Sequence, residues 1–274
     1  MSSPRNERQM TPEIVAPDLV DSHCHLDFAD FDGEVPALIA RAQAAGVTRM
    51  VTICTRLRNE PKVRAIAEAY PPVFYAAGTH PMSAADEPMA TVAELVALAA
   101  HPKVDAKRVA LMGFSHGGIV TMLASTTWAK ENFAPAGQPS FRAFFPFYPY
   151  CNTIFPERDR VSAPVRIHTG AADDWTPAKP CADLAGSLKA AGQDVSISVY
   201  PDAYHSFAEA RDTVFLPNVV NPADCFAKMP SILGPLAPES IANCVKKGAT
   251  VGNSPSATEQ ARKNLRTQLE ELLR

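Results

Sequence analysis

The sequence lacks the features that would place it in a membrane or on nucleic acid. No apolar run approaches the ~20 residues of a membrane helix. The first residues are polar and contain no apolar signal-peptide core, so we expect a soluble, cytoplasmic protein. The net charge is only −3, so no general basic field attracts nucleic acid. Glycine, at 13 residues, is outnumbered by proline at 25, which favours stiff loops over disorder.

No C-x-x-C pair occurs among the six cysteines, so zinc-ribbon and thioredoxin-type chemistry lack support. Two of the six lie in expected strands of the first segment, where small buried thiols are common. The other four lie in or beside expected loops. They are compatible with two disulfides, Cys151–Cys181 and Cys225–Cys244, in an exported ancestor. Four free thiols are the alternative, which the missing signal peptide favours.

Apolar runs of strand length alternate with segments of helical periodicity along the chain. We expect strands over 19–25, 47–55, 73–78, 108–112, 141–148, 165–170 and 195–200. We expect helices over 34–45, 58–70, 91–100, 119–124, 181–191 and 256–273. This rhythm predicts right-handed βαβ units, and therefore an α/β fold with a mainly parallel sheet flanked by helices. Residues 212–255 are expected to form an irregular insertion that serves as a lid or rim over a site.

One short stretch combines a strand, a sharp turn and a helix. The apolar run from Arg108 leads into Gly113-Phe114-Ser115-His116-Gly117, a G-x-S-x-G pattern, and a helical run follows at once. That context is typical of a nucleophile elbow, in which the serine hydroxyl is exposed above the end of a parallel sheet. The two glycines are expected to leave room where a side chain would collide with the backbone. A plain glycine-rich turn is the alternative.

A serine nucleophile needs a base within hydrogen-bond reach and a third group that orients the base. Asp173 follows a later strand and His205 follows the next one, which is the Ser…Asp…His order of α/β-hydrolases. We expect Ser115 to be the nucleophile, His205 the general base and Asp173 the orienting acid, with the His116 N–H in the oxyanion hole. Asp174 could replace Asp173, and a turn residue and an ordinary loop histidine are the alternatives for the two partners.

From about Val104 onward the chain resembles the dienelactone hydrolase family of α/β-hydrolases. The matching residues are Val104–Val109, Gly113–Gly118, Asp173–Pro177 and Tyr200–Phe207. The resemblance implies hydrolysis of small carboxylic esters or lactones without a cofactor. Many members of that family carry a cysteine nucleophile, whereas this chain has Ser115, which favours ordinary ester chemistry. The loop that normally donates a second oxyanion N–H precedes the elbow in that fold, and no residue here is assigned to it.

A histidine pair lies upstream of the elbow. His23 and His25 are two apart on an expected strand, so both side chains lie on one face, a spacing that suits two imidazoles on one metal ion. Catalytic metals usually have three protein ligands and an open position. His80, His101, His168 or a carboxylate could supply the third. An H-x-H pair without its remaining ligands is the alternative.

The stretch from Leu19 to about Val104 resembles TatD-type metal-dependent deoxyribonucleases. The matching residues are Asp21–Leu26, Ala45–Val47 and Gly78–Pro81. The resemblance implies a (β/α)8 barrel, a divalent Mg, Mn or Zn ion and a nucleic-acid substrate. The later strands that would supply the remaining ligands are absent, because the chain enters the hydrolase motif instead.

The sequence therefore predicts a chimera of three segments. Residues 1–17 form a polar arm, 18–103 the first three βα units of a TIM-barrel-like fold, and 104–274 an α/β-hydrolase-like part. The two folded segments could share one continuous sheet. The leading hypothesis is a serine hydrolase that acts on a small ester or lactone. A metal-dependent hydrolase that uses His23 and His25, and an inactive fusion, are the alternatives. The sequence indicates no membrane association and no particular oligomeric state.

Overall fold

The computed structural model describes residues 19–80, 83, 85–88, 90–102, 104–134 and 140–274, so the expected polar arm lies outside the described residues. The chain divides into two compact units, Met1–Ala99 and Ala100–Arg274. Each unit has its own sheet and its own buried clusters, so the expectation that one sheet could run through both segments is wrong. No helix among the described residues is long and apolar enough to cross a membrane.

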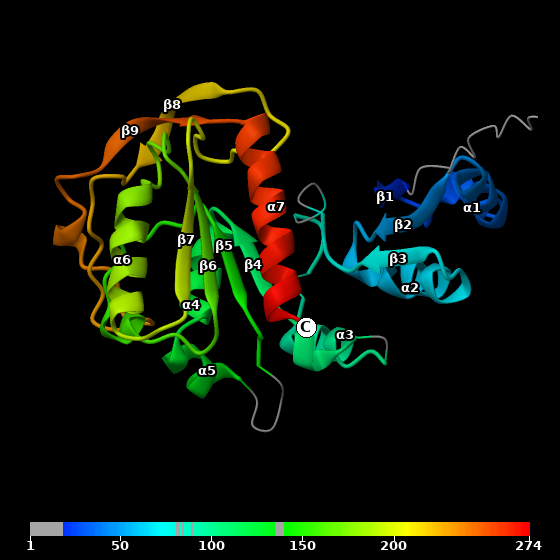
Figure 1. Ribbon diagram of the computed structural model, residues 1–274, viewed down its shortest axis with the longest axis horizontal. Helices are drawn as coiled ribbons and strands as arrows, with labels where there is room; N and C mark the ends of the chain where they lie inside the picture. Colours follow the sequence, from blue (N-terminus) through cyan, green and yellow to red (C-terminus); the bar gives the residue numbers. More distant parts are fainter. Residues whose placement is uncertain (1–18, 81–82, 84, 89, 103, 135–139) are drawn as a thin grey trace, which may run out of the picture. The chain divides into compact units, whose positions relative to one another are not determined.

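The first unit contains a parallel sheet in the order β1-β2-β3 (Figure 1). The strands are β1 (Leu19–Cys24), β2 (Val47–Ile53) and β3 (Val73–Ala76). The helices are α1 (Val35–Ala44), α2 (Glu60–Ala69) and α3 (Val92–Ala99). These elements match the βα alternation that the sequence predicts, with each strand one or two residues shorter than expected.

The buried cluster of the first unit joins α1 and α2 to one face of this sheet. Ile39 of α1 and Ala67 of α2 pack with Met50 and Val73 of the strands. Phe74 points to the opposite face, because neighbouring strand residues alternate, and it is 53% exposed. Parallel sheets are normally covered on both faces. In this unit the helices α1 and α2 cover one face of the sheet.

The second unit is built on a parallel sheet in the order β4-β5-β6-β7. The strands are β4 (Leu111–Phe114), β5 (Phe144–Phe147), β6 (Val165–Gly170) and β7 (Val195–Tyr200). The helices are α4 (His116–Ala124), α5 (Thr127–Phe133), α6 (Ala178–Ala190) and α7 (Pro255–Leu272). Of these, α5 is absent from the sequence prediction.

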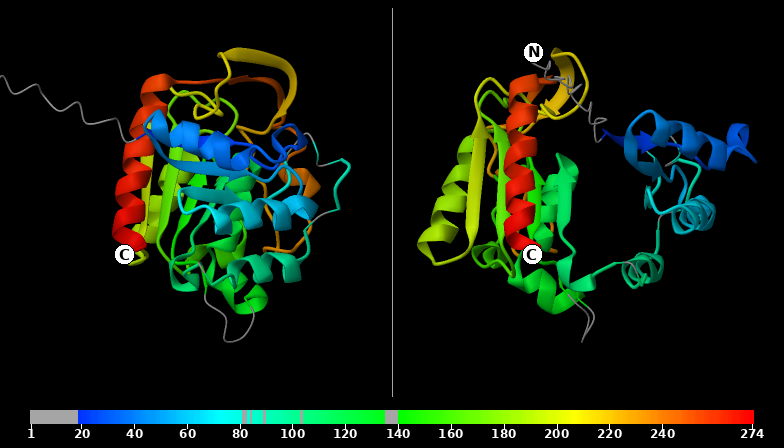
Figure 2. Two further views of the ribbon diagram at one scale, coloured as in Figure 1. Left: turned by 90° about the vertical axis from the view of Figure 1, so that its right-hand side faces the viewer. Right: turned by 45° about the vertical axis from the view of Figure 1, so that its right-hand side comes forward.

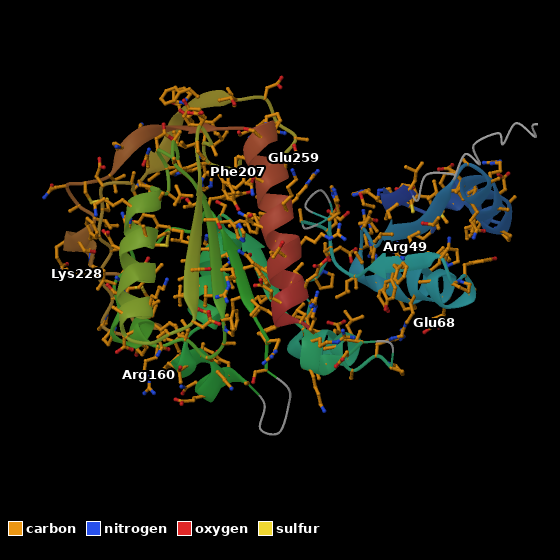
Figure 3. All side chains as sticks on the ribbon, viewed as in Figure 1. Arg49, Glu68, Arg160, Phe207, Lys228 and Glu259 are labelled. Atoms are coloured by element: carbon orange, nitrogen blue, oxygen red, sulfur yellow. A yellow bond between two sulfur atoms is a disulfide. The ribbon has the colours of Figure 1, made fainter. Side chains whose placement is uncertain are left out.

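Helices cover both faces of this second sheet (Figures 1 and 2). On one face, Ala257 and Ala261 of α7 pack on Phe145 and Phe147 of β5 and on Phe207. Phe207 is fully buried and lies beside α7 in Figure 3. On the other face, α6 packs against side chains such as Phe144, which alternates with Phe145 along the strand. Mainly parallel sheets flanked by helices thus form the fold, as the sequence predicts.

The segment 212–255 is more regular than expected. β8 (Val214–Asn221) and β9 (Lys246–Val251) form an antiparallel ribbon, so the expectation of an irregular insertion is wrong at both of its ends. Pro217 obscures the strand signal, because proline cannot donate to a strand ladder. A two-stranded ribbon tolerates proline through its free edges, and the pairing here shifts register between Leu216 and Val220.

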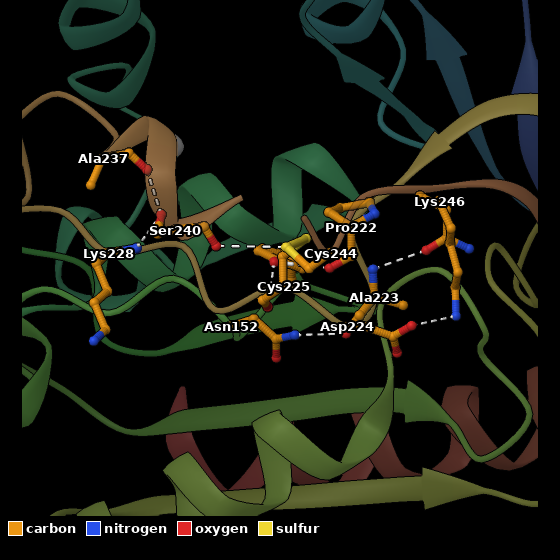
Figure 4. Close-up of a disulfide and its surroundings, with 12 residues drawn as sticks. Asn152, Pro222, Ala223, Asp224, Cys225, Lys228, Ala237, Ser240, Cys244 and Lys246 are labelled. Carbon is orange, nitrogen blue, oxygen red and sulfur yellow. Dashed lines mark hydrogen bonds and ion pairs between the residues drawn. A yellow bond between two sulfur atoms is a disulfide. The ribbon is translucent and has the colours of Figure 1, made fainter. Parts of the chain in front are cut away.

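Four of the six cysteines form disulfides, Cys151–Cys181 and Cys225–Cys244, which is the pairing that the loop positions allowed. Cys225–Cys244 joins the two ends of the long loop between β8 and β9 (Figure 4). The same loop is bound to the loop after β5, where Asn152 Nδ2 donates to the carbonyl of Ala223 at 2.9 Å. Cys24 and Cys54 of the first unit are free thiols.

Candidate active site

Ser115 occupies the sharp turn between β4 and α4. Its φ of 52° lies in the left-handed region, which costs energy for any residue other than glycine. The turn is tied to the neighbouring strand, because the Ser115 N–H donates to the Phe147 carbonyl at 3.0 Å. The serine residue is half-buried. The geometry matches the strained strand-to-helix turn of a nucleophile elbow.

Two glycines allow the close packing of this turn. A Cβ on Gly113 would overlap the carbonyl of Gly117, and a Cβ on Gly118 would lie 2.6 Å from the carbonyl oxygen of Phe147. A Cβ on Gly117 would meet nothing within 4 Å. The sequence prediction is therefore right for Gly113 and wrong for Gly117, where the neighbouring Gly118 carries the steric requirement instead.

The structure brings Ser115, His205 and Asp173 into one hydrogen-bonded chain. Ser115 Oγ lies 2.8 Å from His205 Nε2, and His205 Nδ1 lies 2.9 Å from Asp173 Oδ2. His205 is 2% exposed and Asp173 5% exposed, so the contact between them is shielded from water. A carboxylate can only accept a hydrogen bond, so Nδ1 carries the imidazole proton and leaves the Nε2 lone pair for the serine hydroxyl.

The Asp173 carboxylate is fixed by its own loop. Its Oδ1 accepts hydrogen bonds from the backbone N–H groups of Trp175 at 3.0 Å and Thr176 at 2.7 Å. Asp174 binds elsewhere, since its carboxylate accepts hydrogen bonds from both the N–H and the hydroxyl of Thr250 on β9. Of the two adjacent acids that the sequence offers, only Asp173 contacts His205.

The β8–β9 ribbon holds the loops that carry the acid and the histidine. The Gly252 N–H, just after β9, donates to the His205 carbonyl at 3.0 Å. Trp175 Nε1 donates to the Val220 carbonyl of β8 at 3.0 Å. The Trp175 ring lies 5.1 Å from the imidazole, and the Tyr148 ring lies 4.9 Å from it. These two aromatic neighbours were not predicted, because they come from two loops that only the fold brings together with the loop of His205.

His116 is the first residue of α4, and its side chain is exposed. The N–H groups of the first helical turn have no carbonyl partner within the helix, so they can bind an anion. This position suits the oxyanion role expected for the His116 N–H.

His168, a possible third metal ligand, has both ring nitrogens engaged. Nδ1 lies 2.6 Å from the Tyr200 hydroxyl and Nε2 lies 3.0 Å from Gln268 Oε1 of α7. Burial lowers the pKa of His168 to about 4. The ring stacks on Phe147 at 4.4 Å between centroids. His168 therefore acts within the core of the second unit.

His23 and His25 lie close together, with ring centroids 5.0 Å apart. Nδ1 of His25 lies 3.2 Å from the Ile53 carbonyl, and its ring stacks on Phe28 at 4.7 Å. Among the described residues no three His, Cys, Asp or Glu side chains gather in a group that could hold a metal ion. Two imidazoles fall short of the three ligands of a catalytic metal, so the described residues do not fit such a centre.

Comparison with known proteins finds two groups of similar proteins. The family model "TatD related DNase" matches residues 20–121, less than half of the chain, and the match ends within α4. The metal-dependent hydrolase YjjV of Escherichia coli is 42% identical over 62 residues, which cover 23% of this chain and 24% of that protein. The metal-dependent hydrolase TatD of Mycobacterium tuberculosis is 42% identical over 89 residues, covering 31% of this chain and 33% of that protein. The chain thus spans a quarter to a third of these relatives.

Solved structures of α/β-hydrolases form the second group. The structure of a "Putative Dienelactone Hydrolase" from Klebsiella pneumoniae aligns with 20% identity and a TM-score of 0.35, covering 58% of this chain and 75% of that one. The esterase PE8 aligns with 14% identity and a TM-score of 0.35, covering 60% of this chain and 87% of that one. The chain is therefore similar to TatD-type hydrolases over residues 20–121 and also to dienelactone hydrolase and esterase structures.

Proposed function

We propose that this protein is a serine hydrolase that cleaves small carboxylic esters or lactones. The observation that carries the proposal is the hydrogen-bonded chain from Ser115 Oγ through His205 to Asp173 Oδ2, with distances of 2.8 and 2.9 Å. Each group has the partner that nucleophilic catalysis requires, because the base contacts the nucleophile and the acid orients the base. The reaction needs no cofactor.

In the first half of the reaction, Ser115 Oγ attacks the substrate carbonyl carbon while its proton passes to His205 Nε2. The imidazolium is stabilised by Asp173, whose carboxylate is already held by two backbone N–H groups. The carbonyl oxygen becomes an oxyanion, and the His116 N–H at the start of α4 donates to it. His205 then protonates the leaving alkoxide, and the acyl group stays on Ser115 as an ester.

In the second half, a water molecule loses a proton to His205 Nε2 and attacks the acyl carbon. The second tetrahedral intermediate collapses as His205 returns the proton to Ser115 Oγ, which releases the carboxylic acid. For a lactone, the leaving alkoxide and the acyl group belong to the same molecule, so one hydroxy acid is the final product.

The direct test is the hydrolysis of p-nitrophenyl acetate together with labelling by a fluorophosphonate probe. Ser115→Ala is expected to abolish both, and mass spectrometry of the labelled protein is expected to place the adduct on Ser115. Asp173→Asn and Asp174→Asn form a matched pair, because the two acids are adjacent and only Asp173 contacts His205. Asp173→Asn should lower kcat by about 10⁴-fold, as for the corresponding acid of a known triad. Full activity of Ser115→Ala would refute the proposal.

A metal-dependent hydrolase with a nucleic-acid substrate is the second candidate, and the family match over residues 20–121 favours it. Under this alternative His23 and His25 would be two of the ligands of the divalent ion, one fewer than a catalytic metal usually has. It predicts DNA cleavage that a chelator removes, that Mg²⁺, Mn²⁺ or Zn²⁺ restores, and that His23→Ala eliminates. Cleavage that survives both the chelator and His23→Ala would count against it. A protein that unfolds cooperatively on heating yet shows neither activity is the outcome expected of an inactive fusion.

A further inference from the structure

We infer that Thr176 is a positioning residue for His205 and Asp173, an inference that rests on the proposed serine hydrolase chemistry. Thr176 lies in the turn after Asp173 and is 8% exposed. Its Oγ1 lies 2.9 Å from Asp173 Oδ2, 3.0 Å from His205 Nδ1 and 3.1 Å from the Tyr148 carbonyl oxygen. One hydroxyl thus contacts both partners of the nucleophile on the side of the imidazole away from Ser115.

The protons at this junction can be assigned. A threonine hydroxyl has one proton to donate and two lone pairs that accept. The Asp173 carboxylate is charged and lies nearer than the Tyr148 carbonyl, so it accepts the stronger hydrogen bond from the hydroxyl. A lone pair of Oγ1 then faces the Nδ1–H of His205, which is shared between Asp173 Oδ2 and Thr176 Oγ1.

This arrangement saturates the carboxylate. Oδ1 accepts from the backbone N–H groups of Trp175 and Thr176, and Oδ2 accepts from the Thr176 hydroxyl and from His205. The backbone bonds hold one oxygen of the carboxylate, and the hydroxyl fixes the rotation that presents the other oxygen to the imidazole. The second contact of the hydroxyl limits the tilt of the ring, which in turn sets the distance from Nε2 to Ser115 Oγ.

Thr176→Val removes the hydroxyl and little else. Valine has nearly the same shape, and the backbone N–H that binds Asp173 Oδ1 remains. Because a hydrogen bond to a charged group is lost, kcat for p-nitrophenyl acetate is expected to fall about 10- to 100-fold. KM should change by less than about threefold, because Thr176 is buried behind the His205 ring, on the side away from Ser115. Thr176→Ser restores the hydroxyl and is expected to restore kcat.

Thr126→Val provides a matched control. Thr126 is also buried, and its hydroxyl accepts from the Ala129 N–H and donates to the Leu123 carbonyl at the start of α5. Its loss should destabilise the second unit, because the residue caps a helix. It should leave kcat unchanged, because Thr126 contacts none of Ser115, His205 and Asp173. Thermal unfolding of all variants separates lost stability from lost positioning.

The decisive readout does not need activity. In protein labelled with ¹⁵N-histidine, the Nδ1–H proton of His205 should give a downfield NMR resonance that shifts in Thr176→Val and returns in Thr176→Ser. An unshifted resonance together with wild-type kcat in folded Thr176→Val would overturn the inference. Failure of the proposed function is distinguishable, because wild-type protein would then show no hydrolysis that depends on Ser115, while the resonance would still report whether Thr176 holds the ring.

Discussion

His168 should make the stability of the second unit depend on pH. Its ring is fully buried between Phe147 and Tyr200, and burial lowers its pKa from 6.5 to about 4. The unfolded chain therefore binds a proton at His168 more readily than the folded protein does. The contribution of His168 to the free energy of unfolding is fully present above about pH 6.5 and is lost as the pH falls toward about 4. Each tenfold difference in proton affinity is worth about 1.4 kcal/mol, so the complete loss is about 3 kcal/mol.

The assay is urea unfolding followed by tryptophan fluorescence. Both tryptophans, Trp128 and Trp175, lie in the second unit, so the signal reports that unit alone. The free energy of unfolding is measured at pH 7.5, 5.5 and 4.5 for wild-type protein and for His168→Gln. Glutamine is neutral throughout and can still hydrogen-bond Gln268. Other titrating groups are common to both proteins, so the difference isolates His168.

Wild-type protein is expected to lose about 1–3 kcal/mol more than His168→Gln between pH 7.5 and 4.5. Parallel pH dependence in the two proteins would refute the reasoning, since it would mean that His168 has the same proton affinity in the folded and unfolded states. A larger loss of free energy of unfolding in His168→Gln than in the wild type would mean that folding raises the pKa of His168 instead of lowering it.

The remaining predictions concern the turn at Ser115 and one disulfide. Gly113→Ala should destabilise the second unit by about 1–3 kcal/mol, because its Cβ overlaps the Gly117 carbonyl, whereas Gly117→Ala has open space and should be neutral or slightly stabilising. Unfolding in urea measures both. Replacing Cys225 and Cys244 with serine should lower the free energy of unfolding by about 3 kcal/mol, since a cross-link 19 residues apart is lost. Cys24→Ser in the first unit should leave the tryptophan-detected transition unchanged.

The strand and helix order could be predicted from the sequence because the apolar periodicity is strong and the βα connections are short. The expected strand over 165–170 matches β6 residue for residue, as the expected strand over 195–200 matches β7. The helix α5 was missed, since it is only seven residues long and its apolar pattern is weak. The ribbon was missed because Pro217 interrupts a strand whose pairing spans 24 intervening residues.

The candidate site was predictable where chemistry follows from residue type and order. Ser115, Asp173 and His205 stand out because each follows a strand, and the carboxyl ends of parallel strands meet at one edge. Thr176 carries no such signal, because a threonine in a turn usually caps or bonds its own backbone. Its role depends on the distance to a histidine 29 residues away, which only the fold defines.

The residues of the two proposed hydrolytic sites lie in different units, so each site can be tested by a substitution in its own unit. The Ser115–His205–Asp173 chain and both disulfides lie within Ala100–Arg274, and His23 and His25 lie within Met1–Ala99. Each unit buries its own hydrophobic cluster. Ester hydrolysis that depends on Ser115 should therefore survive His23→Ala and a chelator, because the proposed chemistry needs no group from the first unit.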